Sequence, residues 1–407
     1  METPLGSGSL RLRTSPALIA ASLLGAASSF FLALALATLV QPLAPRLGHV
    51  DRPGPRKRHE RPVPLGGGIA IFFAIALPMG AAVLVAKGAV RAVPGLGRGS
   101  KLGVELAADA GALTVFLVAA LVIHLAGVWD DQRALSPWAK LSVQIIAAAP
   151  LVTAFGVGVL PQWLDPIPSA IVAILWIVAV TNAFNFLDGT DGLAATVGAL
   201  CAAMFLVSAF LSGQAAEAFL FSLLIGALVA FLLFNFPPAK LFMGDGGSQV
   251  VGFVLGFCSL RLTYFDAGWT LESPWYAVFT PLVVLAIPLY DLVTVIALRL
   301  VQRRNPFLGD DQHFIHRLSR RGLGARGVLV LVGACTVATG IGGVMLSRLE
   351  AWQAVLVVLQ TMMILIVLAL LEIHLAGRSG IVSEDDRAVP ATTTEASRST
   401  RGRGAAP

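Results

Sequence analysis

The sequence predicts an all-α membrane protein, a polytopic bundle in which about eleven helices cross the bilayer. Of its 407 residues, 57% are hydrophobic and 13% are charged, whereas about a quarter of the residues in a soluble domain are charged. Apolar runs of about 20 residues recur along the chain, and a helix of that length crosses a hydrocarbon core about 30 Å thick. Polar stretches separate these runs, and the richest of them fall on alternate connections.

The first predicted span follows Arg11 and Arg13. Its apolar run is longer than the hydrophobic region of a cleaved signal peptide, so we expect it to remain as a helix. Residues 1–377 would form one integral membrane domain, and residues 378–407, rich in Ser, Thr, Arg, Gly and Ala, a disordered tail. The predicted spans cover residues 16–44, 65–87, 106–127, 138–160, 168–187, 191–213, 216–235, 247–264, 275–301, 325–347 and 351–376.

The polar stretches occupy the odd-numbered connections, which open on one side of the membrane if there are eleven spans. Short cytoplasmic connections are enriched in lysine and arginine. Such residues gather in the first connection (Arg46, Arg52, Arg56, Lys57, Arg58, Arg61) and in the ninth (Arg303, Arg304, Arg317, Arg320, Arg321, Arg326). The second connection, with Lys87, Arg91, Arg98 and Lys101, runs against this balance. The balance still predicts cytoplasmic odd connections, an outside N-terminus and a cytoplasmic tail.

The fifth connection, DGTD, belongs to the polar stretch NAFNFLDGTDG, which lies between two uncharged runs. The polar residues of this stretch recur at every third position: Asn182, Asn185, Asp188 and Asp191. Three residues advance about 300° around a helix, so these side chains form one slowly drifting stripe. A plain turn with an aspartate cap would need fewer such groups. Because ionisable groups at membrane depth are costly and usually functional, we expect the stripe to line a site.

Two further segments place carboxylates on the same side. In GVWDDQRALSP, Asp130 and Asp131 precede Ser136 and Pro137, a pair that marks a helix start. Adjacent carboxylates repel each other, which raises one pKa or attracts a cation, although such a pair is also common in ordinary loops. In LFMGDGGS, Asp245 lies among glycines before a helix. Backbone N–H groups there suit phosphate, and a carboxylate beside them suits Mg²⁺.

Two connections carry histidines among basic residues. His313 and His316 in the ninth connection lie beside Arg317. A zinc site would want a third protein ligand, and the arginines are better explained by an anionic substrate such as a diphosphate. The first connection contains three basic residues and a histidine in a row, Arg56, Lys57, Arg58 and His59, and these side chains could hold a lipid phosphate. On a membrane protein, basic clusters also mark ordinary cytoplasmic loops, and we expect no nucleic acid partner.

Carboxylates that suit Mg²⁺, with cations around them, indicate phosphate chemistry on a membrane-embedded substrate. The alternative of an ion-coupled transporter would tend to place its carboxylates near the bilayer midplane at a repeat interface, and no repeat is visible. An intramembrane prenyltransferase would use Asp-Asp-x-x-Asp, whereas Ala134 and Leu135 follow Asp-Asp-Gln-Arg here.

The ordered motifs DRPGPRKRHERPVPLGG, GVWDDQ, NAFNFLDGTDGLA, LFMGDGGS and PLYD, followed by the histidine connection, span roughly residues 45–325. Together they resemble the polyprenyl-phosphate N-acetylhexosamine-1-phosphate transferase family (glycosyltransferase family 4). The first motif is more similar to the GlcNAc-1-phosphate transferase branch than to the phospho-MurNAc-pentapeptide transferase branch, which stays as an alternative. The GlcNAc branch commonly has His-x-His-His in the ninth connection, where this chain has Ile315 at one histidine position.

The resemblance implies a site on the cytoplasmic face of a bacterial inner membrane, and it allows a homodimer. A phosphate oxygen of undecaprenyl phosphate would attack the sugar-bound phosphorus of a UDP-amino sugar, release UMP and leave a lipid-diphosphate sugar for envelope polysaccharide synthesis. The implied metal is Mg²⁺, or Mn²⁺, on Asp245 and Asp191. The implied catalytic residues are Asp130, Asp131 and His313. The implied substrate-binding residues are Asn185, Asp188, Asp191, Phe242, Arg56, Lys57, Arg58, His59, His316 and Arg317.

Overall fold

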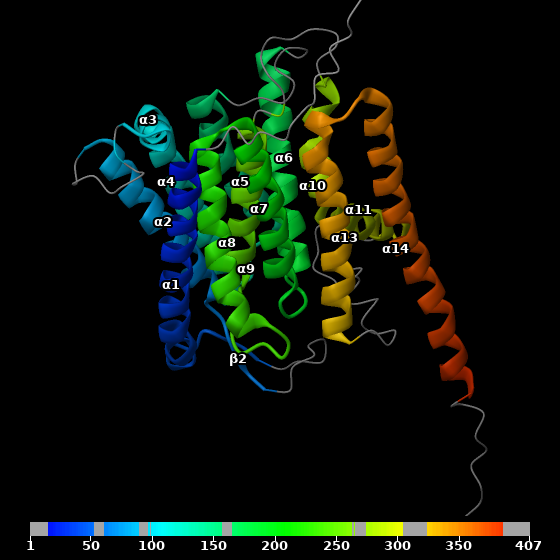
Figure 1. Ribbon diagram of the computed structural model, residues 1–407. Helices are drawn as coiled ribbons and strands as arrows, with labels where there is room; N and C mark the ends of the chain where they lie inside the picture. Colours follow the sequence, from blue (N-terminus) through cyan, green and yellow to red (C-terminus); the bar gives the residue numbers. More distant parts are fainter. Residues whose placement is uncertain are drawn as a thin grey trace, which may run out of the picture.

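The computed structural model describes residues 15–52, 61–88, 97, 99–156, 165–262, 264, 274–303 and 324–385. These residues form a helical bundle with one two-stranded hairpin (Figure 1). The α-helices are α1 Pro16–Arg46, α2 Gly67–Ala86, α3 Lys101–Ala108, α4 Ala110–Gln132, α5 Pro137–Phe155, α6 Pro166–Leu187, α7 Leu193–Ser212, α8 Ala215–Asn235, α9 Asp245–Arg261, α10 Thr280–Val284, α11 Ala286–Val301, α13 Ala325–Met345 and α14 Ala351–Asp385. Two 3₁₀ turns, η1 Trp275–Phe279 and η2 Leu346–Arg348, complete the helical structure of this part of the chain.

The prediction of a polytopic bundle is confirmed, and the described part of the chain supports nine or ten of the eleven predicted spans. Within the described residues, nine helices are long and apolar enough to cross a membrane. A tenth span is added if the bent pair Trp275–Val284 and Ala286–Val301 counts as one. This pair bends by 68°, and Pro288 lies just after the break, where it cannot donate the helical hydrogen bond to residue 284.

The predicted span at residues 247–264 corresponds to α9, which has only 17 residues and lies at the centre of the bundle. Fourteen of those residues are buried. In Figure 1, α7, α8 and α9 run through the middle, α1 lies on one side, and α13 and α14 lie on the other. The helix α14 continues to Asp385, eight residues past the expected domain end at 377.

Glycines let α2 and α4 approach the first turn of α9 very closely. A Cβ atom on Gly127 of α4 would lie 2.5 Å from the carbonyl oxygen of Asp245. A Cβ atom on Gly68 of α2 would lie 2.4 Å from the backbone nitrogen of Gly247. Real side chains do not fit at such distances, so the absence of a side chain at these positions places two helices directly against the segment that carries Asp245.

The opposite end of α9 is held by ion pairs. Arg261 lies 2.7 Å from an oxygen of Asp109 and 2.6 Å from an oxygen of Glu217. Its guanidinium also lies over the ring of Phe155, 4.2 Å from the ring centre. Because Asp109 precedes α4 and Glu217 begins α8, Arg261 joins the last turn of α9 to three other helices. The length of α9 is about 25 Å at about 1.5 Å per residue, so this network lies far from Asp245.

Candidate active site

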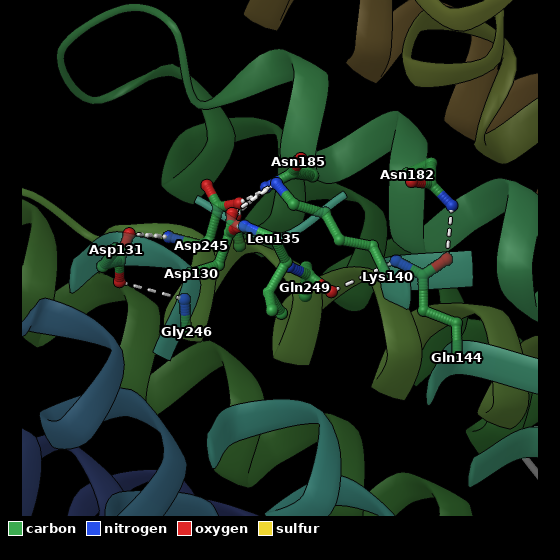
Figure 2. Close-up of polar contacts among 11 residues, drawn as sticks. Asp130, Asp131, Leu135, Lys140, Gln144, Asn182, Asn185, Asp245, Gly246 and Gln249 are labelled. Carbon is green, nitrogen blue, oxygen red and sulfur yellow. Dashed lines mark hydrogen bonds and ion pairs between the residues drawn. The ribbon is translucent and has the colours of Figure 1, made fainter. Parts of the chain in front are cut away.

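Asp131 joins the end of α4 to the start of α9. One of its carboxylate oxygens accepts the backbone N–H of Asp245 at 2.8 Å, and the other accepts the N–H of Gly246 at 3.3 Å. These two N–H groups belong to the first turn of α9, where an α-helix leaves its donors unpaired. The two segments therefore meet at the start of α9, where Asp131 acts as a helix-capping carboxylate from another helix (Figure 2).

Lys140 of α5 lies between two of the predicted site carboxylates. Its ammonium contacts a carboxylate oxygen of Asp130 and lies 2.9 Å from one of Asp245 (Figure 2). Asp130 also accepts the backbone N–H of Leu135 at 2.6 Å, which fixes the short connection between α4 and α5. The sequence motifs do not include Lys140. The available signal was its position, one turn after the Ser136–Pro137 helix start that follows the aspartate pair.

The end of α6 and the turn to α7 bring the polar stripe to the same place. The Asn185 amide donates to the hydroxyl of Ser248 on α9 at 3.0 Å. Asp188 caps α6, and burial together with the charges of Asp245, Asp131 and Asp191 raises its pKa well above the ordinary value. Four carboxylates, those of Asp131, Asp188, Asp191 and Asp245, therefore lie near one another where the α4, α6 and α9 segments meet.

Asn182 lies deeper in the bundle and has a different environment. Its amide donates to the side chain of Gln144 at 2.6 Å, and the amide of Gln144 donates to Gln249 at 3.1 Å (Figure 2). Gln144 and Gln249 are buried. This chain of amides links α5, α6 and α9 just inside the carboxylates, and it satisfies polar groups that would be costly to leave unpaired in an apolar interior.

Asp191 and Asn235 bind the α6–α7 turn to the connection between α8 and α9. A carboxylate oxygen of Asp191 accepts the N–H of Ala239 at 2.9 Å. The side chain of Asn235 accepts the N–H of Gly192 at 2.8 Å and donates to the carbonyl of Leu241 at 2.9 Å. The loop that leads to Asp245 is therefore held by the turn that carries Asp188 and Asp191.

The hairpin of β1 (Val50–Asp51) and β2 (Val63–Pro64) extends this arrangement to the first connection. The N–H of Phe242 donates to the carbonyl of Pro64 at 2.9 Å, and the carbonyl of Phe242 accepts the N–H of Gly67 at 2.9 Å. Phe242 is half-buried. The first connection thus meets the Phe242–Gly244 segment directly, although nothing in the sequence spacing indicated a strand pairing there.

Seven predicted site residues meet at this end of the bundle: Asp130, Asp131, Asn185, Asp188, Asp191, Phe242 and Asp245. The remaining predicted residues, Arg56, Lys57, Arg58, His59, His313, His316 and Arg317, lie outside the described residues.

Comparison with known proteins identifies the family to which this chain belongs. Residues 113–263 match the family described as Glycosyl transferase family 4. A decaprenyl-phosphate N-acetylglucosaminephosphotransferase of Mycobacterium tuberculosis is 33% identical, over 72% of this chain and 74% of that protein. The chain belongs to glycosyl transferase family 4. A probable undecaprenyl-phosphate N-acetylglucosaminyl 1-phosphate transferase of Bacillus subtilis is 28% identical, over 81% of this chain and 86% of that protein.

A third relative is an undecaprenyl-phosphate alpha-N-acetylglucosaminyl 1-phosphate transferase of Yersinia pestis, 27% identical over 79% of this chain and 83% of that protein. The family resemblance predicted from the ordered motifs is thus confirmed. The glycosyl transferase family 4 match contains Asp130, Asp131, Asp188, Asp191 and Asp245. The protein is a multi-pass membrane member of a family of sugar-phosphate transferases that act on polyprenyl phosphates.

The donor groups of this family 4 site suit a hard divalent cation. In the described part of the chain, Lys140 contacts Asp130 and Asp245, and burial, followed by the neighbouring carboxylates, raises the pKa of Asp188. Within the ranges that the structure describes, no group of three His, Cys, Asp or Glu side chains forms a ready metal cage. Mg²⁺ does not require one, because it usually binds one or two carboxylates together with substrate phosphates and water. The residues present therefore fit Mg²⁺.

Proposed function

We propose that this protein transfers N-acetylhexosamine 1-phosphate, with N-acetylglucosamine as the expected sugar, from a UDP-sugar to undecaprenyl phosphate. A lipid phosphate oxygen would form the new bond to the sugar-bound phosphorus, and the bond from that phosphorus to UMP would break. The observation that carries the proposal is the contact of Asp131 with the backbone of Asp245, with Lys140 between Asp130 and Asp245. The names of all three relatives support N-acetylglucosamine, two of them name undecaprenyl phosphate, and the third names decaprenyl phosphate.

In this proposal Asp245 holds Mg²⁺, with Asp191 as the second carboxylate. When bound, the metal neutralises phosphate charge that develops during transfer. Asp131 is a positioning residue, because both of its oxygens accept N–H groups of α9. Asp130 and Lys140 are the side chains proposed to contact the lipid phosphate. A lipid phosphate carries most of its charge near pH 7, since phosphate monoesters have a second pKa of about 6, so a strong base is less important than positioning.

Asn185 and Asp188 would line the nucleotide pocket, with Phe242 against the uracil ring. The sugar and the diphosphate would be bound by His313, His316 and Arg317. The lipid headgroup would be bound by Arg56, Lys57, Arg58 and His59. We place this site on the cytoplasmic face of a bacterial inner membrane, with the N-terminus outside. The product would be a lipid-diphosphate sugar that starts a cell-envelope polysaccharide.

The test is UMP release by the purified protein in detergent. Undecaprenyl phosphate and Mg²⁺ would be supplied with UDP-GlcNAc, UDP-GalNAc or UDP-MurNAc-pentapeptide, one donor at a time. We expect UMP with an N-acetylhexosamine donor, and only when lipid and metal are both present. Asp245→Ala should abolish turnover. Release with the pentapeptide donor alone would replace the proposed sugar, and no release with any donor from folded protein would contradict the proposed reaction.

A further inference from the structure

A buried histidine on α4, unused in the proposed chemistry, contacts the same turn of α9 that carries Asp245. His124 is 3% exposed, and its Nδ1 atom lies 2.8 Å from the carbonyl oxygen of Gly246. A carbonyl oxygen can only accept, so Nδ1 carries the proton and donates. The sequence alone favours a structural role for a lone histidine inside an apolar span, and it does not indicate this partner.

His124 and Asp131 act on one peptide segment from one helix face. They are seven residues apart, which is close to two full turns, so both side chains project toward α9. Asp131 accepts the N–H of Gly246 at 3.3 Å, while His124 donates to the carbonyl of the same residue. Gly246 is thus held on both its N–H and its C=O by α4, and it directly follows Asp245.

The imidazole itself has little freedom to move. Its ring stacks on Phe72 of α2, with ring centres 4.8 Å apart and an angle of 5° between the planes. Phe73 meets it edge-on at 6.4 Å. The ring is therefore clamped between α2 and α4, and a hydrogen bond in such a low-dielectric setting is stronger than one in water.

Close contacts with Gly127 and Val128 of α4 leave the first turn of α9 no room to adjust if this bond is lost, except by moving away. A Cβ atom on Gly246 would lie 2.7 Å from Cγ2 of Val128, and one on Gly127 would lie 2.5 Å from the Asp245 carbonyl. Any loosening of the first turn of α9 therefore displaces the Asp245 carboxylate. Sites of this kind need their groups within about 0.5 Å of the working geometry.

We propose that His124 is a positioning residue for the divalent cation held by Asp245. It acts through the hydrogen bond to the Gly246 carbonyl, with its ring fixed by Phe72. The inference rests on the proposed function, because it takes Asp245 as the ligand. It assigns no contact between His124 and the substrates.

The experiment measures Mn²⁺ binding to the detergent-solubilised protein by electron paramagnetic resonance, which does not depend on turnover. His124→Phe keeps a ring against Phe72 and removes the donor, whereas His124→Asn keeps a donor near the Nδ1 position and removes the ring. Leu125→Ala, at the adjacent exposed position, is the matched control. Thermal unfolding of each variant is followed in parallel.

We expect His124→Phe to weaken Mn²⁺ binding about 2- to 12-fold, the effect of one lost hydrogen bond. His124→Asn should bind Mn²⁺ within about twofold of the original protein, since the donor is what matters. If His124→Phe cannot be obtained folded, Phe72→Leu loosens the ring and should weaken binding in the same direction. Leu125→Ala should have no effect.

Unchanged Mn²⁺ affinity in His124→Phe, or in Phe72→Leu, would overturn the inference even if the unfolding temperature fell. Equal weakening in His124→Asn and His124→Phe would also overturn it, because the hydrogen bond would then be irrelevant. In both cases UMP release by the original protein would leave the proposed function standing. An original protein that releases UMP but binds no Mn²⁺ would overturn the inference and the metal site together.

Discussion

Removal of the Lys140 ammonium tests the central arrangement of the site. In the structure Lys140 contacts Asp130 and lies 2.9 Å from Asp245. Its side chain is 26% exposed, and that of Asp130 is 8% exposed, so water screens these contacts only in part. Lys140→Met keeps most of the apolar stem and deletes the charge. It leaves two carboxylates close together without their shared cation.

The magnitude follows from the role proposed for Lys140 at the lipid phosphate, because kcat/KM reports only interactions that the transition state makes. A hydrogen bond to a charged group contributes about 1.5–3 kcal/mol. A loss of this size corresponds to a decrease of about 10- to 10²-fold in kcat/KM. The concentration of Mg²⁺ for half-maximal rate should not rise, because the ammonium no longer competes for Asp245.

The assay is UMP release over a range of Mg²⁺ concentrations, with thermal unfolding measured on the same samples. Lys101→Met is the matched control, because Lys101 is 59% exposed, pairs with Glu105 at 4.0 Å and lies before α4 rather than after it. We expect the control to retain activity within about twofold. A Lys140→Met protein that keeps kcat/KM within about threefold of the original would refute the reasoning.

Three further outcomes are expected. Asp131→Asn, which keeps one oxygen for the α9 N–H groups, should lower Mg²⁺ affinity less than Asp131→Ala, and equal losses in a Mg²⁺ titration would contradict the positioning role. Arg261→Met should destabilise the protein by about 3–5 kcal/mol, because Glu217 would stay buried without its partner, and an unchanged thermal unfolding midpoint would show that the network is dispensable. Treatment with EDTA should stop UMP release, Mg²⁺ or Mn²⁺ should restore it, and activity that survives the chelator would exclude a loosely bound metal.

Most of the helices could be predicted from the sequence, because the residues that start and end a helix act on the backbone of that same segment. Ser136 and Pro137 mark the start of α5, where the Ser136 hydroxyl accepts the N–H of Ala139, and Gly156 ends the same helix in a left-handed conformation. The eleven predicted spans include α9, a helix of 17 residues of which fourteen are buried, and hydropathy by itself does not show that a helix is so enclosed by its neighbours. The bend before α11 has a local cause, because Pro288 cannot donate a hydrogen bond to residue 284.

For the site, too, some features follow from the sequence and others only from the tertiary structure. By itself, the sequence determined that Asp130, Asp131, Asp188, Asp191 and Asp245 belong to ordered motifs at span ends, and those motifs predicted the family. The tertiary structure decided which groups touch, because Lys140 of α5 contacts Asp245 of α9 and His124 of α4 contacts Gly246 of α9. Their contacts depend on glycine-mediated approach of helices that are distant in the chain. Such contacts are long-range and carry no local periodicity, so only the packed bundle reveals them.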